Sequence, residues 1–500
     1  MDFIRNFPFF SIIICMFSGI LSSVLDGKKA RNLCIGAVSI VTMLSACVLF
    51  YTVKTDSSFT YMMGHYPEPW GNEIRAGILE GLLATTFSFV LLLTLVSAYH
   101  RTSEDIESSK LNLFYLLADL LLSSLLAIIY TNDLFTAYVF VEINTIAACG
   151  LIMIRQIGRT FGAAMKYMVM SLVGSGLFLI GLSLLYTLTG QLLMSPAKEA
   201  LANLVVADQY HLPVLAVLVL MSVGLAIKSG LYPFHSWMPD AYGFSTASAS
   251  AILSGLVSKA YIILLIKIFY RVVEIDFIVN SEMMNVLFVF GLVGMVMGSV
   301  DAILEKDIRR MIAFSSVAQI GYIYMGIGLG IEAGYVAAVY HILHHAATKA
   351  LLFISVVGLS NVSGGSKLFP DLRGAAYRHK VAGVAFTVGS LSMVGLPMFS
   401  GFISKYLFAT AAMSASPKKV FLTLIVLGIS TILNAIYFLH TVVTIYTPKE
   451  ENSEKPESRS WKEKPWVTVS LCLFIGLNFF LGLRSQIVVE LIIRGLHMFG

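Results

Sequence analysis

Charged side chains are scarce in this chain of 500 residues. Asp, Glu, Lys and Arg together make up only 13% of it, whereas hydrophobic residues make up 57%. Such a composition is too apolar for an ordinary soluble globular protein. It predicts a lipid bilayer as the surrounding solvent, and nucleic acid is not an expected partner.

Cysteine is also rare, and the sequence has only five, each within an apolar run: Cys15, Cys34, Cys47, Cys149 and Cys472. Without a CxxC pair, they are expected to be small packing residues, and no metal or iron–sulfur site is predicted. The sequence contains no P-loop, no GxGxxG motif and no haem-attachment motif. We therefore expect no cofactor and no catalytic residue within this chain. Residues 1–25 lack a small-residue cleavage site, which favours a retained first helix over a removed signal peptide.

Long apolar runs, in contrast, recur along the whole chain. With about 20 residues needed for each crossing, we predict an all-α integral membrane protein of about fourteen spans, near 8–25, 31–53, 77–99, 111–130, 133–153, 161–190, 212–231, 246–270, 283–303, 309–330, 333–360, 381–412, 420–447 and 466–483. The seventh and twelfth spans contain both Gly and Pro and are not expected to be plain helices.

Basic residues are distributed unevenly between alternate loops. The richer set is Lys28, Lys29, Arg31, Arg101, Lys110, Arg155, Arg159, Lys306, Arg309, Arg310, Lys367, Arg373, Arg378, Lys380, Lys449, Lys455, Arg459, Lys462 and Lys464. The poorer set, with both ends of the chain, is Arg5, Lys54, Arg75, Lys198, Arg271, Lys418, Lys419, Arg484 and Arg494. The positive-inside rule makes the richer loops cytoplasmic, so both termini are predicted on the outer face of a cell membrane.

Several ionisable residues fall inside the predicted spans: Glu142, Asp119, Lys228, Lys259, Lys349, Lys405 and the histidines His341 and His345. An unpaired lysine at such depth costs about 2.5–3.5 kcal/mol on insertion scales. His341, His345 and Lys349 are spaced four residues apart and so share one helix face. The set predicts a hydrophilic pathway through the protein interior. A structural ion pair, histidines that only pack, and a bis-histidine haem site are the weaker interpretations.

Other ionisable groups are less informative. Lys166 and Lys267 lie nearer the ends of their spans and are expected to extend towards the membrane surface. Asp119 is interpreted equally well as a second acid of the pathway or as a helix-packing group. His344 is one residue off the histidine stripe and receives no role.

Two of the deep lysines lie beside predicted interruptions of a helix. Lys228 is followed by "SGLYP", and Lys405 is preceded by "GLPMFSGFIS". Proline removes a backbone N–H and glycine permits a bend, so both segments are expected to unwind near mid-membrane. Interruptions five spans apart predict two inverted five-helix repeats. The chain then divides into N-terminal helices 1–3 (1–110), a first repeat of helices 4–8 (111–270), a second of helices 9–13 (271–447), and a polar cytoplasmic loop with helix 14 (448–500).

Five motifs occur in a characteristic order: "GLYPFHSWMPDA" at 230–241, "ASAILSGLVSKAYIILLIKI" at 249–268, "KDIRRMIAFSSVAQIGY" at 306–322, "HHAATKALLF" at 344–353 and "GLPMFSGFISKYLF" at 395–408. On these motifs the chain resembles the antiporter-like subunits shared by respiratory complex I, Mrp-type sodium/proton antiporters and group 4 membrane-bound hydrogenases.

The resemblance implies proton half-channels joined by a central relay, in which a glutamate of the fifth span pairs with a lysine of the seventh. The matching residues are Glu142, Lys228, Lys259, His341, His345 and Lys405, and the predicted relay also includes Lys349, which shares the helix face of the two histidines. Burial disfavours the charged form of a lysine and a nearby carboxylate favours it, so movement of Glu142 relative to Lys228 is expected to switch the lysine between holding and releasing a proton. A lysine at 405 is more similar to the Mrp and hydrogenase members, and to one subtype of complex I subunit, than a glutamate would be.

The leading hypothesis is a subunit that translocates protons, or sodium and protons, in a multisubunit membrane complex. Redox chemistry would occur in complex I-like or hydrogenase-like partner subunits, because this chain has no predicted redox centre. The first alternative is a subunit of an Mrp-type Na⁺/H⁺ antiporter without redox coupling. A stand-alone solute carrier is disfavoured because the polar groups form a row and not one compact site, and a structural scaffold is disfavoured by the complete set of lysines.

Overall fold

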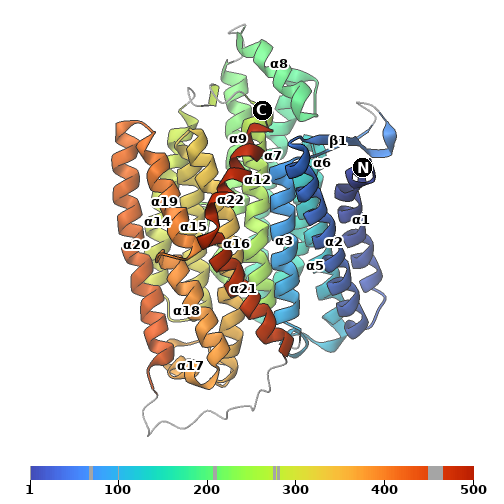
Figure 1. Cartoon of the computed structure of the whole chain (residues 1–500). Coiled ribbons are helices and arrows are strands. Elements are labelled where there is room, and N and C mark those ends of the chain that lie inside the picture. The colour runs from blue at the N-terminus through green and yellow to red at the C-terminus, as the bar shows by residue number, and fades with distance from the viewer. Residues whose placement is uncertain are drawn as a thin grey trace.

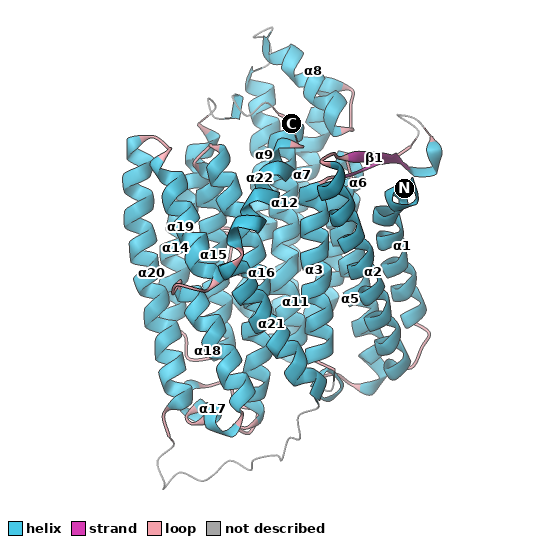
Figure 2. Ribbon diagram, in the orientation of Figure 1, coloured by secondary structure: helices cyan, strands magenta, loops and turns pink. Residues whose placement is uncertain are grey.

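The computed structural model describes residues 2–66, 71–99, 101–206, 211–273, 277–278, 282–448 and 465–499. Within these ranges the chain is a bundle of helices with a single two-stranded antiparallel sheet, β1 (Phe59–Met62) paired with β2 (Glu73–Ala76) (Figure 2). The polar segment 449–464, for which the sequence predicts a connecting loop, lies outside the described residues.

The helices of the first half are η1 (Asp2–Asn6), α1 (Phe7–Ser22), α2 (Gly27–Thr55), η2 (Met63–His65), α3 (Ile78–Ser97), α4 (Arg101–Asp105), η3 (Ser108–Lys110), α5 (Leu111–Tyr130), α6 (Leu134–Met153), α7 (Gly158–Thr189), α8 (Met194–Val206), α9 (His211–Ser229), α10 (Met238–Phe244), α11 (Ala247–Ile252), the π-helical turn η4 (Leu253–Val257) and α12 (Ser258–Arg271). Those of the second half are α14 (Met283–Leu304), α15 (Ile308–Gly328), α16 (Glu332–Asn361), η5 (Phe369–Leu372), α17 (Ala375–Arg378), α18 (Lys380–Val394), α19 (Ser400–Met413), α20 (Pro417–Tyr446), α21 (Pro465–Leu483) and α22 (Ser485–His497).

Thirteen helical stretches in the described part of the chain are long and apolar enough to cross a membrane. Each lies within a few residues of a span predicted from the sequence. The predicted twelfth span, 381–412, instead contains two shorter helices, α18 and α19, which are separated by residues 395–399. Both termini lie at the same end of the bundle (Figure 1). The chain is therefore a multi-pass membrane protein.

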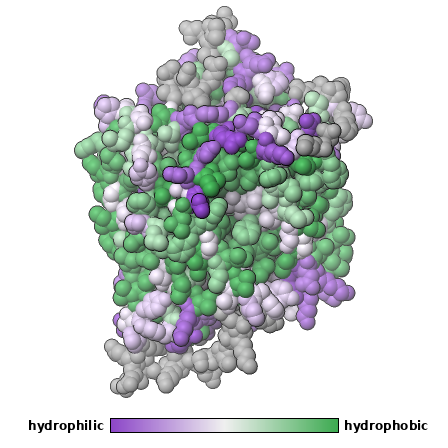
Figure 3. All heavy atoms as spheres, viewed as in Figure 1, coloured by the Kyte–Doolittle hydropathy of each residue, from purple (hydrophilic) through white to green (hydrophobic). Residues whose placement is uncertain are grey.

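The outer surface of the bundle matches a bilayer. In the face shown in Figure 3, hydrophobic residues occupy most of the middle and hydrophilic residues gather towards the two ends. Large apolar side chains are exposed along α7 and α20, including Met165, Val169, Phe421 and Ile432. Contiguous apolar surface of this kind faces lipid or a partner protein, because water would oppose its exposure.

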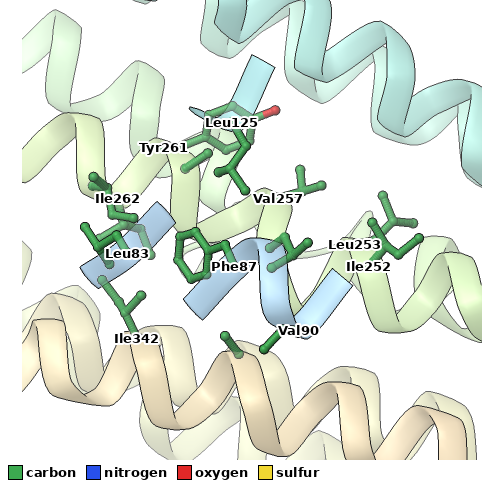
Figure 4. Close-up of a cluster of buried hydrophobic side chains, with 14 of the residues drawn as sticks. Leu83, Phe87, Val90, Leu125, Ile252, Leu253, Val257, Tyr261, Ile262 and Ile342 are labelled. Atoms are coloured by element: carbon green, nitrogen blue, oxygen red, sulfur yellow. The ribbon is translucent and has the colours of Figure 1, made fainter. Parts of the chain in front are cut away.

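A dense apolar core fills the centre between α3, α12 and α16. Figure 4 shows Phe87 of α3 among aliphatic side chains that include Val257 of η4 and Ile342 of α16, and all three are buried. Such packing leaves little room for water. The ionisable side chains of the same helices are therefore held in a medium where unpaired charge is costly.

Two glycines bring α7 and α9 into close contact. A Cβ atom on Gly224 would lie only 2.6 Å from the carbonyl oxygen of Gly174, and one on Gly174 would lie 3.0 Å from Cγ of Lys228. Small residues allow the backbones of two membrane helices to approach in this way. The contact fixes α9 against α7 and places the stem of Lys228 along the surface of α7.

The two interrupted helices end in the same backbone motif. α9 is followed by Gly230 with φ of 79° and α18 by Gly395 with φ of 91°, a left-handed conformation that glycine adopts without a Cβ penalty. In each case the N–H of the following leucine bonds across the turn, Leu231 to the Ala226 carbonyl and Leu396 to the Leu391 carbonyl, both at 3.1 Å. This is the six-to-one bond of a Schellman motif, which ends a helix cleanly.

The glycine contact predicts a difference between two substitutions. Gly224→Ala places a methyl group against the backbone of α7, and such overpacking typically costs about 1–3 kcal/mol. Gly176→Ala, on α7 where a Cβ meets nothing within 4 Å, is the matched control. We expect Gly224→Ala to lower the thermal unfolding temperature of the purified protein and Gly176→Ala to leave it unchanged or raised. Equal unfolding temperatures would contradict the close contact.

Candidate functional site

The structure pairs Glu142 of α6 with Lys228 of α9. Oε1 of Glu142 lies 3.3 Å from Nζ of Lys228, which also donates to Oγ1 of Thr145 at 2.7 Å. The hydroxyl of Ser175 on α7 donates to the same carboxylate oxygen. The Lys228 side chain is fully buried, whereas that of Glu142 is 25% exposed. The ion pair thus connects the protein interior with the lateral surface of the bundle.

Neutral polar groups extend inwards from this ion pair. Glu142 and Thr145 face Lys228 together because they are three residues apart on α6. The Tyr261 hydroxyl lies 3.4 Å from Thr145 Oγ1 and 3.2 Å from the Asn144 amide oxygen, and that amide donates to Ser124 at 2.9 Å. None of these neutral residues was predicted from the sequence, although the Glu142–Thr145 spacing was a usable signal.

Lys259 lies beside the π-helical turn η4. Its ammonium group donates to the carbonyl of Ser254, inside that turn, and to Oγ of Ser258 at 3.1 Å. A π-turn shifts the backbone hydrogen-bond register and is frequent at functional sites. The hydroxyl of Ser254 lies 3.0 Å from that of Ser316 on α15. The distortion thus supplies a carbonyl oxygen to a lysine that is fully buried.

Lys349 of α16 is held by α15. Its ammonium group donates to the carbonyl of Ile312 at 3.0 Å and to the hydroxyl of Ser315, and it lies 5.7 Å from the centre of the Phe438 ring. Because Lys349 is completely buried, these contacts replace the water that would otherwise surround its charge.

The histidine stripe forms a stack along α16. The rings of His341 and His345 lie 6.0 Å apart with 14° between their planes, and Tyr322 stacks on His341 at 5.5 Å. Nδ1 of His341 is 2.7 Å from the Ser404 hydroxyl. Among the described residues, Nε2 of His341 and both ring nitrogens of His345 have no hydrogen-bond partner. These nitrogens are therefore not committed to holding the helices together.

Lys405 of α19 bonds to the end of the interrupted helix α18. Its ammonium group donates to the carbonyl of Val394, the last residue of α18, at 2.6 Å, and to Oγ1 of Thr431 at 2.9 Å. A helix end leaves carbonyl groups without intrahelical partners. The break after Val394 therefore creates the oxygen that the lysine needs.

His344, for which the sequence indicates no role, lies at the same break. Its Nδ1 is 2.7 Å from the Ser400 hydroxyl and 3.2 Å from that of Thr348. Ser400 and Thr348 both bond to Asn478 of α21, each at 2.8 Å. His344 thus joins a polar cluster between α16, α19 and α21, a connection that the spacing within α16 does not reveal.

The expectation that Lys267 extends towards the membrane surface is wrong. Lys267 is fully buried and donates to three carbonyls at the end of α5, those of Ile128, Ile129 and Thr131, at 3.2, 2.8 and 2.5 Å. The negative end of that helix binds a cation locally, so the side chain need not reach water. Lys166, in contrast, is partly exposed and pairs with Asp240 at 3.0 Å.

Asp119 lies among the N-terminal helices. It accepts hydrogen bonds from Ser18 of α1 at 2.7 Å and from Cys34 of α2 at 3.1 Å, and its side chain is fully buried. These contacts favour a helix-packing role over a second acid of the row. Within the described ranges, no three His, Cys, Asp or Glu side chains are grouped to hold a metal ion.

Comparisons with known proteins identify the class of chain. A family model described as "NADH:quinone oxidoreductase/Mrp antiporter, TM" matches residues 131–432, a range that contains every residue from Glu142 to Lys405. The NADH-quinone oxidoreductase subunit N of Desulforudis audaxviator is 30% identical over 98% of this chain and 98% of its own length. A Na⁺/H⁺ antiporter subunit of Bacillus subtilis is 25% identical over 96% of this chain and 94% of its own length.

A solved structure shares the fold. A subunit of the membrane-bound sulfane sulfur reductase, an archaeal respiratory membrane complex, superimposes with a TM-score of 0.86 at 24% identity, covering 100% of this chain and 98% of that one. The structural match extends beyond residues 131–432 and includes the N-terminal and C-terminal helices. The chain therefore belongs to the NADH:quinone oxidoreductase/Mrp antiporter family of transmembrane proteins.

Proposed function

We propose that this chain translocates protons, or sodium and protons, as one subunit of a multisubunit membrane complex that is driven by redox chemistry in partner subunits. The observation that carries the proposal is a row of ionisable side chains inside an otherwise apolar bundle, contributed by α6, α9, α12, α16 and α19: Glu142, Lys228, Lys259, His341, His345, Lys349 and Lys405. The similarity to a subunit of an NADH-quinone oxidoreductase supports redox coupling.

The Glu142–Lys228 pair is the proposed switch of this row. Lys259, Lys349 and Lys405 donate to neutral carbonyl and hydroxyl oxygens. Lys228 instead contacts a carboxylate, which favours the charged ammonium more strongly than a neutral oxygen does. When Glu142 withdraws, Lys228 loses that stabilisation and releases its proton, and when Glu142 returns, Lys228 holds one.

Groups that both donate and accept hydrogen bonds connect the ionisable residues. Thr145 and Tyr261 carry hydroxyls beside Lys228, and a hydroxyl can pass a proton by changing its partner. His341 and His345 can each take up a proton at one ring nitrogen and release it from the other. The uncommitted nitrogens of this stack leave both histidines available for such exchange.

Lys405 is the proposed exit gate. Its contact with the carbonyl of Val394 links the charge of the lysine to the break between α18 and α19. Irregular backbone at membrane depth is tolerated where it lines protein or a hydrated cavity. A transporter with interrupted helices commonly places its ion site at such a position.

The partial exposure of the Glu142 side chain supports the proposal that this chain works as one subunit of a membrane complex. One quarter of its side chain is accessible at the lateral surface of the bundle, inside a membrane span. A carboxylate facing lipid at that depth is costly. A neighbouring membrane subunit covering α6 and α7 would remove the cost and extend the row beyond this chain.

We also propose fourteen spans, with α18 and α19 together forming the twelfth, and two inverted repeats over 111–270 and 271–447, flanked by 1–110 and 448–500. The matching Schellman motifs at Gly230 and Gly395 support this symmetry. An even number of spans agrees with termini at one end of the bundle, which the charge pattern assigns to the outer face.

The second candidate function is a subunit of an Mrp-type Na⁺/H⁺ antiporter without redox coupling. It is favoured by the similarity to the Na⁺/H⁺ antiporter subunit of Bacillus subtilis. The two functions differ in the partners that co-purify with the chain. Iron–sulfur or hydrogenase-like subunits support redox coupling, whereas small membrane subunits alone, with activity driven by a sodium gradient, support exchange.

Cysteine labelling tests the orientation. Lys306 is exposed in the loop between α14 and α15, and Ser416 in the loop between α19 and α20. The proposed topology puts these two loops on opposite sides of the membrane. Lys306→Cys should react with a membrane-impermeant thiol reagent only from the cytoplasm, and Ser416→Cys only from outside. The unsubstituted chain controls for its native cysteines. Labelling of both variants from one side would contradict the proposed topology.

A double-mutant cycle tests the ion-pair switch. Glu142→Gln and Lys228→Met should each abolish coupled transport, and the double variant should be no worse. In unfolding experiments, the effects of the two substitutions should differ from additivity by about 0.5–3 kcal/mol, because the partners are in contact. This departure from additivity should fall in the lower part of the range, since the Glu142 side chain is partly exposed. Strict additivity in stability would show that the residues act independently.

Removal of the exit lysine tests the row itself. Lys405→Ala should leave the complex assembled on a native gel while reducing electron-donor-driven proton uptake into inverted vesicles to the level of vesicles without the complex. Lys418→Ala, an exposed lysine at the start of α20, is the matched control and should pump normally. Normal pumping by Lys405→Ala would remove this residue from the mechanism.

A further inference from the structure

A second cluster of charged residues lies away from the relay, around a pocket at the end of the bundle that carries most basic loops. Arg155, Arg309 and Lys367 line it together with Asp105 and Ser360. The pocket has a cavity volume of about 40 Å³, and a single water needs about 10–15 Å³ of such volume, so the pocket has room for one small polar group the size of a few waters. We refer to this site as the basic pocket.

Two of its basic groups are positioned by backbone carbonyls. The Arg309 guanidinium donates to the carbonyl of Tyr242 at 3.0 Å and also to Ser250 Oγ at 2.6 Å, and the Lys367 ammonium lies 3.4 Å from the carbonyl of Gly243. These partners belong to α10 and the start of α11, which pack against α15 and α16. The basic groups are therefore held by the fold at the sides of the pocket.

The pocket contains more positive than negative charge. Three basic side chains face one carboxylate, that of Asp105. Burial, with the adjacent guanidinium groups of Arg309 and Arg155, lowers the pKa of Lys367 to about 7, while the nearby carboxylates of Asp307 and Asp105 oppose this effect. Like charges gathered in a partly enclosed space repel one another, and a bound anion would relieve the repulsion.

We propose that the basic pocket binds a phosphate-bearing anion between Arg155, Arg309 and Lys367, supplied either by the headgroup of an anionic phospholipid or by a free phosphate compound. Guanidinium groups match phosphate oxygens in geometry and charge. Two valines of α16, Val356 and Val357, form an apolar wall beside the cations, which suits the first carbons of a lipid acyl chain. The positive-inside rule assigns this end of the bundle to the cytoplasmic leaflet, where anionic lipids bind basic pockets between helices.

The first experiment compares binding by the full chain and by pocket variants. Purified, delipidated protein is titrated in one arm with phosphatidylglycerol, with bound lipid counted by native mass spectrometry. In the other arm it is titrated with inorganic phosphate, and its unfolding temperature is followed. Each of Arg155→Gln and Lys367→Gln should weaken binding about tenfold, as expected for loss of a charge-assisted hydrogen bond. Lys306→Gln, an exposed lysine of the adjacent loop, should bind as the wild type does.

The two arms identify the source of the phosphate. Lipid binding that depends on Arg155 and Lys367, without a response to inorganic phosphate, supports a lipid headgroup. Stabilisation by inorganic phosphate that depends on the same residues supports a soluble phosphate compound. The proposal is overturned if the protein neither binds phosphatidylglycerol nor is stabilised by inorganic phosphate. It is also overturned if Lys306→Gln weakens binding as much as the pocket substitutions do.

The pH dependence of lipid binding gives an independent readout. The phosphodiester of phosphatidylglycerol stays charged from pH 6 to pH 8, so a change in this range reports on the pocket. Lys367 is charged below its pKa of about 7, and binding should weaken as the pH rises through that value. Lys367→Arg keeps its charge at pH 8 and should bind with little pH dependence. If lipid binding by Lys367→Arg depends on pH in the same way as binding by the wild type, Lys367 is not the group that titrates and its proposed role is overturned.

Discussion

A buried ammonium group must find oxygen atoms within the protein, because no water surrounds it to take up its three hydrogen bonds. In this chain the deep lysines satisfy the requirement in related ways. Lys259, Lys349 and Lys405 each bond to one backbone carbonyl and one hydroxyl. Lys267 uses three carbonyls at a helix end, and Lys228 uses a hydroxyl and a carboxylate. Each of these contacts holds the segment that supplies the oxygen beside the lysine that needs it.

Regular helices cannot supply all of them, since their interior carbonyls are already bonded along the axis. The irregular segments of the bundle meet this need. The end of α18 presents Val394 to Lys405, the π-turn η4 presents Ser254 to Lys259, and the end of α5 presents its last carbonyls to Lys267. Each of these three segments, a helix end or a π-turn, thus lies beside a buried lysine.

Much of this architecture could be predicted from the sequence, because the signals are local. The spans follow from apolar runs, and the interruptions at Gly230 and Gly395 follow from Gly and Pro near a lysine. The oxygen partners that come from distant segments could not be predicted, such as Thr431 for Lys405 and Asn478 for the cluster around His344. The position of Lys267 was predicted wrongly for the same reason, since its partners lie at the end of α5. The π-turn at 253–257 has no simple composition that marks it.

The glycine contact between α7 and α9 has a consequence for how the chain moves. Lys228 is buried, and its stem lies on a helix that backbone contact through Gly174 and Gly224 clamps to its neighbour. Glu142 is held by hydrogen bonds from side chains only, those of Ser175 and Lys228, and a quarter of its own side chain is uncovered. In the proposed switch, Glu142 would therefore be the side chain that moves and Lys228 the one that stays in place. A signal from a neighbouring subunit would then enter by displacing a single side chain at the surface, without any helix of this chain having to slide.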